Sequence, residues 1–475
     1  MSSDELIRLT AREAVSLLKS GAVSPLELVD AALARIAATD GAINAMPTLC
    51  PERARAQAMR LAAGINVPAE PGPGWLGGLP VAIKELDDLA GVRTTYGSPI
   101  FADNVPTRSD IIVERLEANG AIPVGMSNSP EFGAGGNTFN EVHGETRNPW
   151  NVKLNAAGSS GGSAAALATG QVWLATGSDL GGSLRTPASF CSVVGFRPSP
   201  GRVAHGPSEL KYGPLSIHGP MARNVGDAAL MLDAMAGWHI EDPLSLPPPP
   251  QPFQLAADWR EAPKRVAFSE DFGITPVDPE VRRLCRDAAW KLEAAGARVE
   301  DAHPDFEGVF EAFQVLRALS FATSMKPLYD NHRHLLKPDI VWNIELGFTL
   351  TPEQIGRAQL RQSRLYADIV AFFETYDVLI APAACTPPLP IEIRWLSELE
   401  GVQWDNYVEW LRIVSVITMS TCPVIALPAA FTEDGRPVGI QMVGHPRGDW
   451  SLLSAAAAFE EIAGIAGLTP IEPRL

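Results

Sequence analysis

Cysteine is scarce in this chain and widely spaced. The 475 residues include five cysteines, Cys50, Cys191, Cys285, Cys385 and Cys422. Their odd number and the lack of any CxxC or Cys/His spacing argue against a disulfide framework and against a structural zinc site. We therefore expect buried free thiols, which suit a reducing, cytoplasmic compartment.

Basic residues and long apolar runs are also in short supply. Lysine and arginine total 38 against 55 acidic residues, which gives a formal net charge of −17 and disfavours a nucleic-acid partner. No run approaches the roughly 20 apolar residues of a membrane helix, and the first residues carry acids where a signal peptide carries bases. We expect a soluble cytoplasmic protein without a membrane partner, either a monomer or a homodimer.

What the sequence does contain is an alternation of helix and strand signals. Residues 10–13 and 24–27 are capping boxes that predict two early helices. Residues 79–83 predict a short buried strand, residues 111–119 a helix and residues 121–126 another strand. This pattern predicts an α/β fold, with a mixed, twisted sheet surrounded by helices.

Two known motifs occur where the surrounding sequence does not support their usual functions. The GxGxxG match at residues 72–77 lies in a proline-rich stretch and follows no strand, so it does not predict a dinucleotide site. Residues 158–162 match GxSxG, which would make Ser160 a hydrolase nucleophile. That motif requires a strand directly before it, but the preceding residues are polar and predict no strand. Such a nucleophile would also need a histidine partner, and three follow at plausible distances: His205, His218 and His445.

Lys84 comes at the end of the predicted strand, directly after the apolar residues 81–83. A buried lysine either pairs with a carboxylate or has its pKa lowered by the loss of water. Glu85 and Asp87 are near enough in sequence to be partners, and pairing is the more ordinary role of a buried lysine. On these residues alone, both readings remain open.

Two glycine-rich loops each place a serine before a predicted helix. Ser159 lies in GSSGGSAAALATG, and Ser183 lies in GSDLGGSLRTP, which follows a strand predicted over residues 171–176. Glycine permits close backbone approach, and a helix N-terminus presents unpaired N–H groups. The second loop could form an oxyanion hole, a phosphate-binding loop or simply a tight turn. The candidate oxyanion donors are the amides of Leu180, Gly181, Gly182 and Ser183.

The long stretch GSSGGSAAALATG…GSDLGGSLRTPASFCSVVGFRPSPGRV closely resembles the amidase signature family, as does the spacing of both serines from the upstream VAIKELDD. Further similar segments cover most of the chain: residues 131–151, 219–232, 376–382 and 435–444. The resemblance implies a single domain over residues 1–475. Its signature core would span about 70–235 and 415–470, with a variable substrate-entrance lobe at about 300–412.

The resemblance also implies a reaction and its residues. It implies hydrolysis of a carbon–nitrogen amide bond without a metal or an organic cofactor. In the family pattern Ser183 attacks the acyl carbon, while Ser159, on a cis peptide bond, relays the proton to a neutral Lys84.

Four neighbouring residues would support that triad. By the family pattern Asp179 and Arg185 pair to brace the nucleophile loop, Ser178 hydrogen-bonds Ser159, and Ser160 lies beside them. A direct role for Arg185 in binding a substrate carboxylate is the alternative to bracing.

The substrate is less well defined by the sequence. Aromatic residues in the variable region suggest a small to medium apolar aryl or alkyl amide, with esters and carbamates as further candidates, although ordinary core packing explains them equally well. They are Phe310, Phe313, Trp342, Trp395, Trp404 and Trp410. Where family members often carry a glycine, this chain has Thr421 before Cys422, a departure expected to alter the floor of the pocket.

Two other functions are compatible with the same fold. One is the glutaminase component of a tRNA-dependent amidotransferase, but the segment AHGPSELKYGPLSIHGP departs from the SSLDQ-like stretch typical of that branch. The other is a catalytically silent scaffold, which would require the loss of a triad residue, and none is lost.

Overall fold

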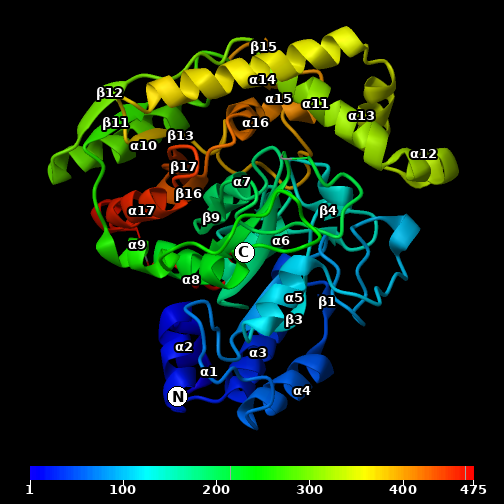
Figure 1. Cartoon of the computed structure of the whole chain (residues 1–475), viewed down its shortest axis with the longest axis vertical. Helices are drawn as coiled ribbons and strands as arrows, with labels where there is room; N and C mark the ends of the chain where they lie inside the picture. The colour runs from blue at the N-terminus through cyan, green and yellow to red at the C-terminus, as the bar shows by residue number, and fades with distance from the viewer. Residues whose placement is uncertain (214, 466) are drawn as a thin grey trace.

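The computed structural model describes residues 1–213, 215–465 and 467–475, and within these ranges a mixed sheet of 11 strands forms the centre of the molecule (Figure 1). From one edge to the other the strands are β1 (Thr48–Leu49), β3 (Ile122–Ser127), β2 (Pro80–Lys84), β8 (Leu174–Asp179), β10 (Ile217–Ala222), β9 (Val194–Arg197), β16 (Val424–Phe431), β17 (Pro437–Val443), β13 (Val378–Pro382), β11 (Arg265–Phe268) and β12 (Arg298–Asp301). Strands β3, β2 and β8 are parallel, as are β13, β11 and β12, and the strands between them pair antiparallel. The predicted α/β class with a mixed sheet is confirmed.

Helices cover both faces of this sheet. The first half of the chain contributes α1 (Ser3–Arg8), α2 (Ala11–Ser20), α3 (Pro25–Ile43), α4 (Pro51–Ala62), α5 (Ile111–Ala118), α6 (Gly161–Ala168), α7 (Arg185–Cys191) and α8 (Val225–Met235). The second half contributes α9 (Phe253–Trp259), α10 (Pro279–Trp290), α11 (Val309–Ser324), α12 (Lys326–His332), α13 (Pro338–Phe348), α14 (Pro352–Phe372), α15 (Tyr407–Trp410), α16 (Arg412–Met419) and α17 (Asp449–Ala463).

Shorter elements lie outside the main sheet. Three two-stranded ribbons are formed by β4 (Phe139–Asn140) with β5 (Gly144–Glu145), β6 (Arg147–Asn148) with β7 (Asn151–Asn155), and β14 (Glu398–Leu399) with β15 (Val402–Gln403). Short 3₁₀ segments are η1 (Pro99–Phe101), η2 (Glu131–Gly133), η3 (Lys291–Ala295) and η4 (Arg333–Leu335).

Both predicted capping boxes begin helices. The Thr10 hydroxyl accepts from the backbone N–H of Glu13 ahead of α2, and Ser24 does the same with Glu27 ahead of α3. A third capping box, Ser2 with Glu5, begins the short helix α1, which the sequence analysis did not predict.

Parallel pairing brings the ends of β2 and β8 to one edge of the sheet. All five residues of β2 are buried, since a parallel strand is covered on both faces. Helix α6 packs against β2 and β8 and is itself wholly buried. Its residues are small because the neighbouring backbone is close: a Cβ on Gly162 would lie 2.3 Å from the amide nitrogen of Asn128.

One predicted boundary is wrong. The strand predicted over residues 171–176 runs instead from Leu174 to Asp179. Residues 177–179, expected to open the glycine loop, pair with residues 217–219 of β10 and so belong to the sheet. The loop proper therefore begins after Asp179.

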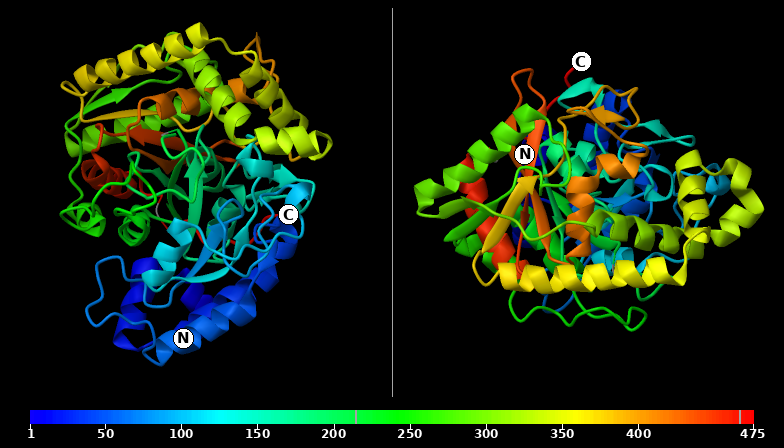
Figure 2. Two further views of the ribbon diagram at one scale, coloured as in Figure 1. Left: turned by 45° about the vertical axis from the view of Figure 1, so that its right-hand side comes forward. Right: turned by 90° about the horizontal axis from the view of Figure 1, so that it is seen from above.

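Helices α11 to α14 form a separate layer at one end of the molecule. Figures 1 and 2 show them gathered on the far side of the sheet from α1 to α4. Within the layer, α11 packs against α13, α14 and α16. This layer supplies the outer wall of the cavity described below.

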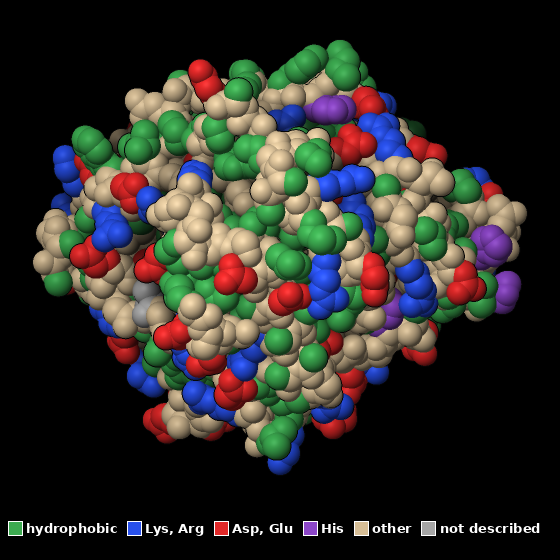
Figure 3. Space-filling model, turned by 90° about the horizontal axis from the view of Figure 1, so that it is seen from below, with side chains coloured by type: hydrophobic (Ala, Val, Ile, Leu, Met, Phe, Trp, Pro, Cys, Tyr) green, Lys and Arg blue, Asp and Glu red, His purple; other side chains and the backbone are tan. Residues whose placement is uncertain are grey.

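The surface charge is mixed rather than segregated on the face drawn in Figure 3, where lysine and arginine side chains lie among aspartate and glutamate side chains. In the described part of the chain, no helix combines the length and apolarity needed to cross a bilayer.

Candidate active site

Lys84 is the last residue of β2, and its side chain is fully buried. Its Nζ lies 2.7 Å from Ser159 Oγ, 2.9 Å from Ser160 Oγ and 3.0 Å from Ser178 Oγ. A neutral amine has two N–H bonds and one lone pair, so it can donate to two of these hydroxyls and accept from the third. The predicted bond from Ser178 to Ser159 is not formed, because the Ser178 hydroxyl contacts the lysine instead.

The acidic residues that could have paired with Lys84 are bound elsewhere. Glu85 accepts from the backbone and the hydroxyl of Thr95, and Asp87 lies 2.8 Å from the Nε2 of His218. Burial lowers the pKa of Lys84 to about 7, against the opposing effect of the Asp87 and Asp179 charges. Of the two readings left open by the sequence, the geometry supports a lysine with a lowered pKa over a lysine in an ion pair.

Behind the lysine lies a buried network that sequence analysis missed. The Asp87 carboxylate also accepts from the hydroxyl of Thr176, which in turn accepts from the backbone N–H of Lys84. Burial alone would raise the pKa of Asp87, but the neighbouring His218 lowers it; the same carboxylate raises the pKa of His218. His205 stacks on His218, and burial lowers the pKa of His205 to about 4.

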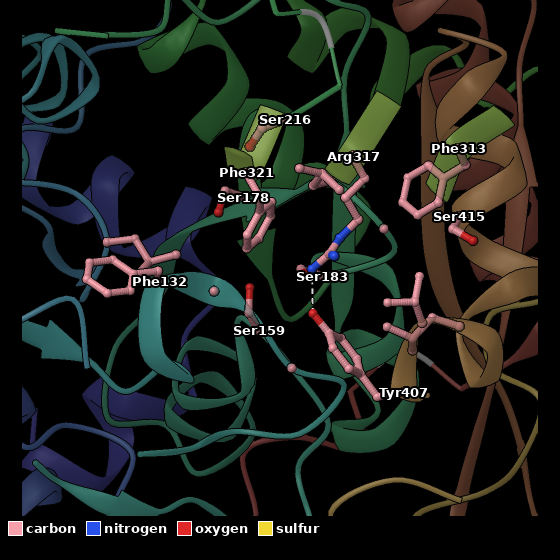
Figure 4. A pocket seen from close by; sticks show the side chains of 17 residues that line it. Phe132, Ser159, Ser178, Ser183, Ser216, Phe313, Arg317, Phe321, Tyr407 and Ser415 are labelled. Carbon is pink, nitrogen blue, oxygen red and sulfur yellow. Dashed lines mark hydrogen bonds between the residues drawn. The ribbon is translucent and has the colours of Figure 1, made fainter. Parts of the chain in front are cut away.

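Ser159 and Ser183 line the same cavity (Figure 4). The Gly158–Ser159 peptide bond is cis, and the Ser160 amide donates to the Ser183 carbonyl at 3.2 Å, which ties the two serine loops together. The hydroxyls of Ser159 and Ser183 are not hydrogen-bonded to each other. Catalytic hydrogen bonds often tighten only when a substrate is bound, so this separation does not disqualify the pair.

The loop that carries Ser183 is held in place by Asp179, whose carboxylate accepts from the amides of Gly182 at 2.9 Å and Leu184 at 3.1 Å. The Arg185 Nε donates to the same carboxylate at 3.0 Å, which confirms the predicted pair. Burial would raise the pKa of Asp179, but Arg185 and Arg197 together lower it well below its usual range. Arg197 is a partner that the sequence analysis missed.

These bonds correct part of the predicted oxyanion hole. The Gly182 amide is already committed to Asp179, so it is not available to a developing oxyanion. The amides of Gly181 and Ser183 have no acceptor among the described residues, and Leu180 and Gly181 line the cavity. Gly182 is still required as glycine, because its φ of 104° lies in the left-handed half of conformational space.

Arg185 has no access to the cavity. Its side chain is fully buried, and its remaining bonds go to Gln441 at 2.7 Å and Thr418 at 3.2 Å. Direct contact with a substrate carboxylate is thus incompatible with the position of Arg185, whose bonds instead connect the loop to Gln441 and Thr418.

The cavity itself is narrow, with a volume of about 100 Å³. Its apolar walls come from Leu86, Phe132, Phe313, Phe321, Val408 and Leu411. Of the six aromatic residues singled out in the sequence, Phe313 alone lines the cavity; Phe310, Trp404 and Trp410 are buried in the core, and Trp342 and Trp395 pack against it. Thr421, the departure expected to alter the floor of the cavity, does not line it, and neither does the buried Cys422.

The alternative serine hydrolase arrangement is not formed. Ser160 contacts Lys84, not a histidine, and His218 is bound to Asp87. No group of three or more histidine, cysteine or acidic side chains in the described ranges is arranged to hold a metal ion.

Comparison with known proteins gives matches over most of the chain. The amidase family model matches residues 27–453. The chain is 34% identical over 475 residues to an acylamidase of Rhodococcus erythropolis, covering 99% of each protein. It is 33% identical to the A-type component of the glutamyl-tRNA(Gln) amidotransferase of Moorella thermoacetica, covering 96% of this chain and 97% of that one. Among solved structures, a bacterial aryl acylamidase of the amidase signature family superimposes with a TM-score of 0.89 at 28% identity, covering 98% of this chain and all of the other.

Proposed function

The chain belongs to the amidase signature family of amide-hydrolysing enzymes, and from that premise we propose that it works through a serine acyl-enzyme. The observation that carries the proposal is the contact of 2.7 Å between Lys84 Nζ and Ser159 Oγ, made by a buried lysine without a carboxylate partner. Ser183 is the nucleophile, Ser159 the relay and Lys84 the base.

The first half of the reaction forms the acyl-enzyme. Ser183 Oγ attacks the carbonyl carbon while its proton passes to Ser159, whose own proton passes to the neutral Lys84. The carbonyl oxygen gains negative charge, and the amides of Gly181 and Ser183 are placed to stabilise it. The relay then returns a proton to the leaving nitrogen as the C–N bond breaks.

Water completes the cycle. It attacks the acyl carbon, gives its proton to the same relay and releases the acid, which restores the Ser183 hydroxyl. A lysine with a pKa of about 7 suits both steps, since a base works best when its pKa lies near the working pH.

The substrate is proposed as a small to medium amide with an aryl or alkyl part. The apolar cavity walls support this, as do the names of the acylamidase and aryl acylamidase relatives. Esters and carbamates pass through the same type of tetrahedral intermediate and belong in the substrate panel.

A fluorophosphonate probe tests the nucleophile directly. We expect one adduct per chain, on Ser183, and no adduct in Ser183→Ala, whose turnover should fall about 1,000-fold or more. An adduct on Ser160 or another serine in the wild type would refute the assignment.

The second candidate is a glutaminase that works within an amidotransferase, favoured by the 33% identity to the A-type component of that enzyme. Hydrolysis of glutamine by the chain alone or with the other amidotransferase components added, in preference to aryl and alkyl amides, would decide for it.

A further inference from the structure

Arg317 is a buried charge in the wall of the active-site cavity. It lies in the middle of α11, is only 6% exposed, and lines the same cavity as Ser159 and Ser183. Figure 4 shows its side chain reaching from α11 toward Tyr407. Among the described residues that line this cavity, it is the only one with a permanently charged side chain.

Its protein partners are all neutral. The guanidinium donates to the Oδ1 of Asn343 in α13 and to the hydroxyl of Tyr407 in α15. It also lies over the ring of Phe321, 4.3 Å from the ring centroid. Burial raises the pKa of Tyr407 even against the lowering effect of Arg317, so the phenol stays neutral and is no counter-ion at neutral pH.

The acids Asp339 and Glu131 are bound to groups other than Arg317. Asp339 is ion-paired with Lys337 at 2.9 Å, and Glu131 accepts from the Lys337 amide at 2.9 Å and from Ser98 at 2.6 Å. In the described ranges no carboxylate forms an ion pair with the Arg317 guanidinium. The buried arginines beneath the nucleophile differ in this respect, since Arg185 and Arg197 both contact Asp179.

The neutral partners also fix the orientation of the guanidinium. Asn343 donates its amide nitrogen to the Asp339 carbonyl at 2.7 Å, which turns its oxygen toward Arg317. Asn343 and Tyr407 accept two of the five guanidinium N–H bonds, and the others have no acceptor among the described residues. A buried cation without an anion among its protein partners is costly, and such a cation is suited to bind an anion from outside the protein.

We infer that Arg317 binds a carboxylate of the substrate, so that the preferred substrates are amides carrying an anionic group in addition to an apolar part. A planar carboxylate can accept two N–H bonds from a guanidinium, a geometry that arginine favours. This inference rests on the proposed amide hydrolysis and names the class of amide. It places the apolar part against Phe321 and Phe313, and the carboxylate at the junction of α11, α13 and α15.

Two isosteric pairs test the inference, because they exchange a carboxylate for an isopropyl group of similar shape. On the amine side the pair is 4-acetamidobenzoate and 4-isopropylacetanilide. On the acyl side it is N-phenylsuccinamate and 4-methyl-N-phenylpentanamide. We expect kcat/KM of the wild type to favour the carboxylate in at least one pair by about 10- to 100-fold, the range for hydrogen bonds to a charged group.

Variants of Arg317 distinguish a role in binding the substrate carboxylate from a role in holding α11, α13 and α15 together. In Arg317→Met that preference should disappear, chiefly through a rise in KM for the carboxylate member, and Arg317→Lys should recover part of it. Arg364→Leu is the matched control, since it removes one positive charge from an exposed position in α14. It should leave the preference as it is in the wild type.

A binding measurement on the wild-type protein tests the inference even if the Arg317 variants fail to fold. Each compound is tested for protection of wild-type Ser183 from the fluorophosphonate, and the carboxylate member should protect at about tenfold lower concentration. Preference for the isopropyl member in both pairs, or an equal loss for both members in Arg317→Met, would overturn the inference. Absence of any adduct on Ser183 would instead count against the proposed function.

Discussion

On the sheet side of the cavity, Lys84 contacts three serine hydroxyls at the end of β2, and every acid near it is already bound to another group. On the helical side, Arg317 projects from α11 between aromatic rings and is held by two neutral groups. Both sides bury a nitrogen base without a carboxylate. In the two proposals made above, the lysine loses its proton whereas the arginine keeps its charge, so similar environments give a base on one side and an anion site on the other.

The largest expected effect is on the sheet side. Lys84→Met should lower kcat/KM by roughly 1,000-fold, because the relay then has no acceptor for the proton. Burial of a neutral side chain should preserve the fold, so the melting temperature should stay close to that of the wild type. Lys153→Met, at an exposed lysine of β7, is the control and should behave as wild type. Near-normal turnover of Lys84→Met at neutral pH would remove the base from the mechanism.

The next largest effect is expected on the stability of the fold, through the ion pairs of Asp179 below the loop that carries Ser183. Asp179→Asn leaves Arg185 and Arg197 buried without an anion, and we expect a loss of about 3–5 kcal/mol in the free energy of unfolding. Denaturant unfolding measures it. Asp4→Asn breaks an exposed pair with Arg8 and should change little. Equal free energies of unfolding for the two variants would show that the ion pairs of Asp179 with Arg185 and Arg197 are not needed for stability.

The pH dependence follows from the sign of the lysine shift. In the proposed mechanism the neutral amine of Lys84 is the active form, and its pKa is lowered to about 7, so kcat/KM should rise with pH and level off above about 7. Well below that value it should fall about tenfold per pH unit. A profile that keeps rising toward pH 10 would mean that Lys84 is an ordinary protonated lysine in solution.

The smallest expected effect is a displacement of that profile. The Asp87 charge raises the pKa of Lys84, so Asp87→Asn should move the acidic limb of kcat/KM to lower pH by roughly one unit or less. Asp88→Asn is the neighbouring control, since Asp88 binds the hydroxyl of Tyr96. A shift of the limb to higher pH in Asp87→Asn would contradict the sign of the interaction.

The two sides of the cavity also differ in how far the sequence predicts them. On the sheet side, the strand that ends in Lys84 and the two glycine loops that carry Ser159 and Ser183 could be predicted from local sequence, whereas the roles of these residues were predicted only from the resemblance to the amidase signature family. Glycines and small residues are constrained there by backbone contacts within a few ångströms, as at Gly162, and such constraints leave a pattern in the sequence.

The helical side leaves no such pattern. Arg317, Asn343 and Tyr407 are far apart in the chain and meet only because α11, α13 and α15 pack together. An arginine within a helix is typical of many exposed faces, so nothing in its local sequence indicates burial in a cavity. His218 was missed as the partner of Asp87 for the same reason: the two residues are brought together by the packing of distant segments, and neither belongs to a local motif.

Helix α6 has a further consequence for how this enzyme can change. All eight of its residues are buried against neighbours that leave no room for a larger side chain at the tightest points. Few substitutions are therefore tolerated around α6. Substitutions that adapt the enzyme to a new substrate are expected in the outer helical wall of the cavity. Libraries aimed at altered selectivity should therefore vary positions 313, 321 and 408 and leave the serine-bearing turns untouched.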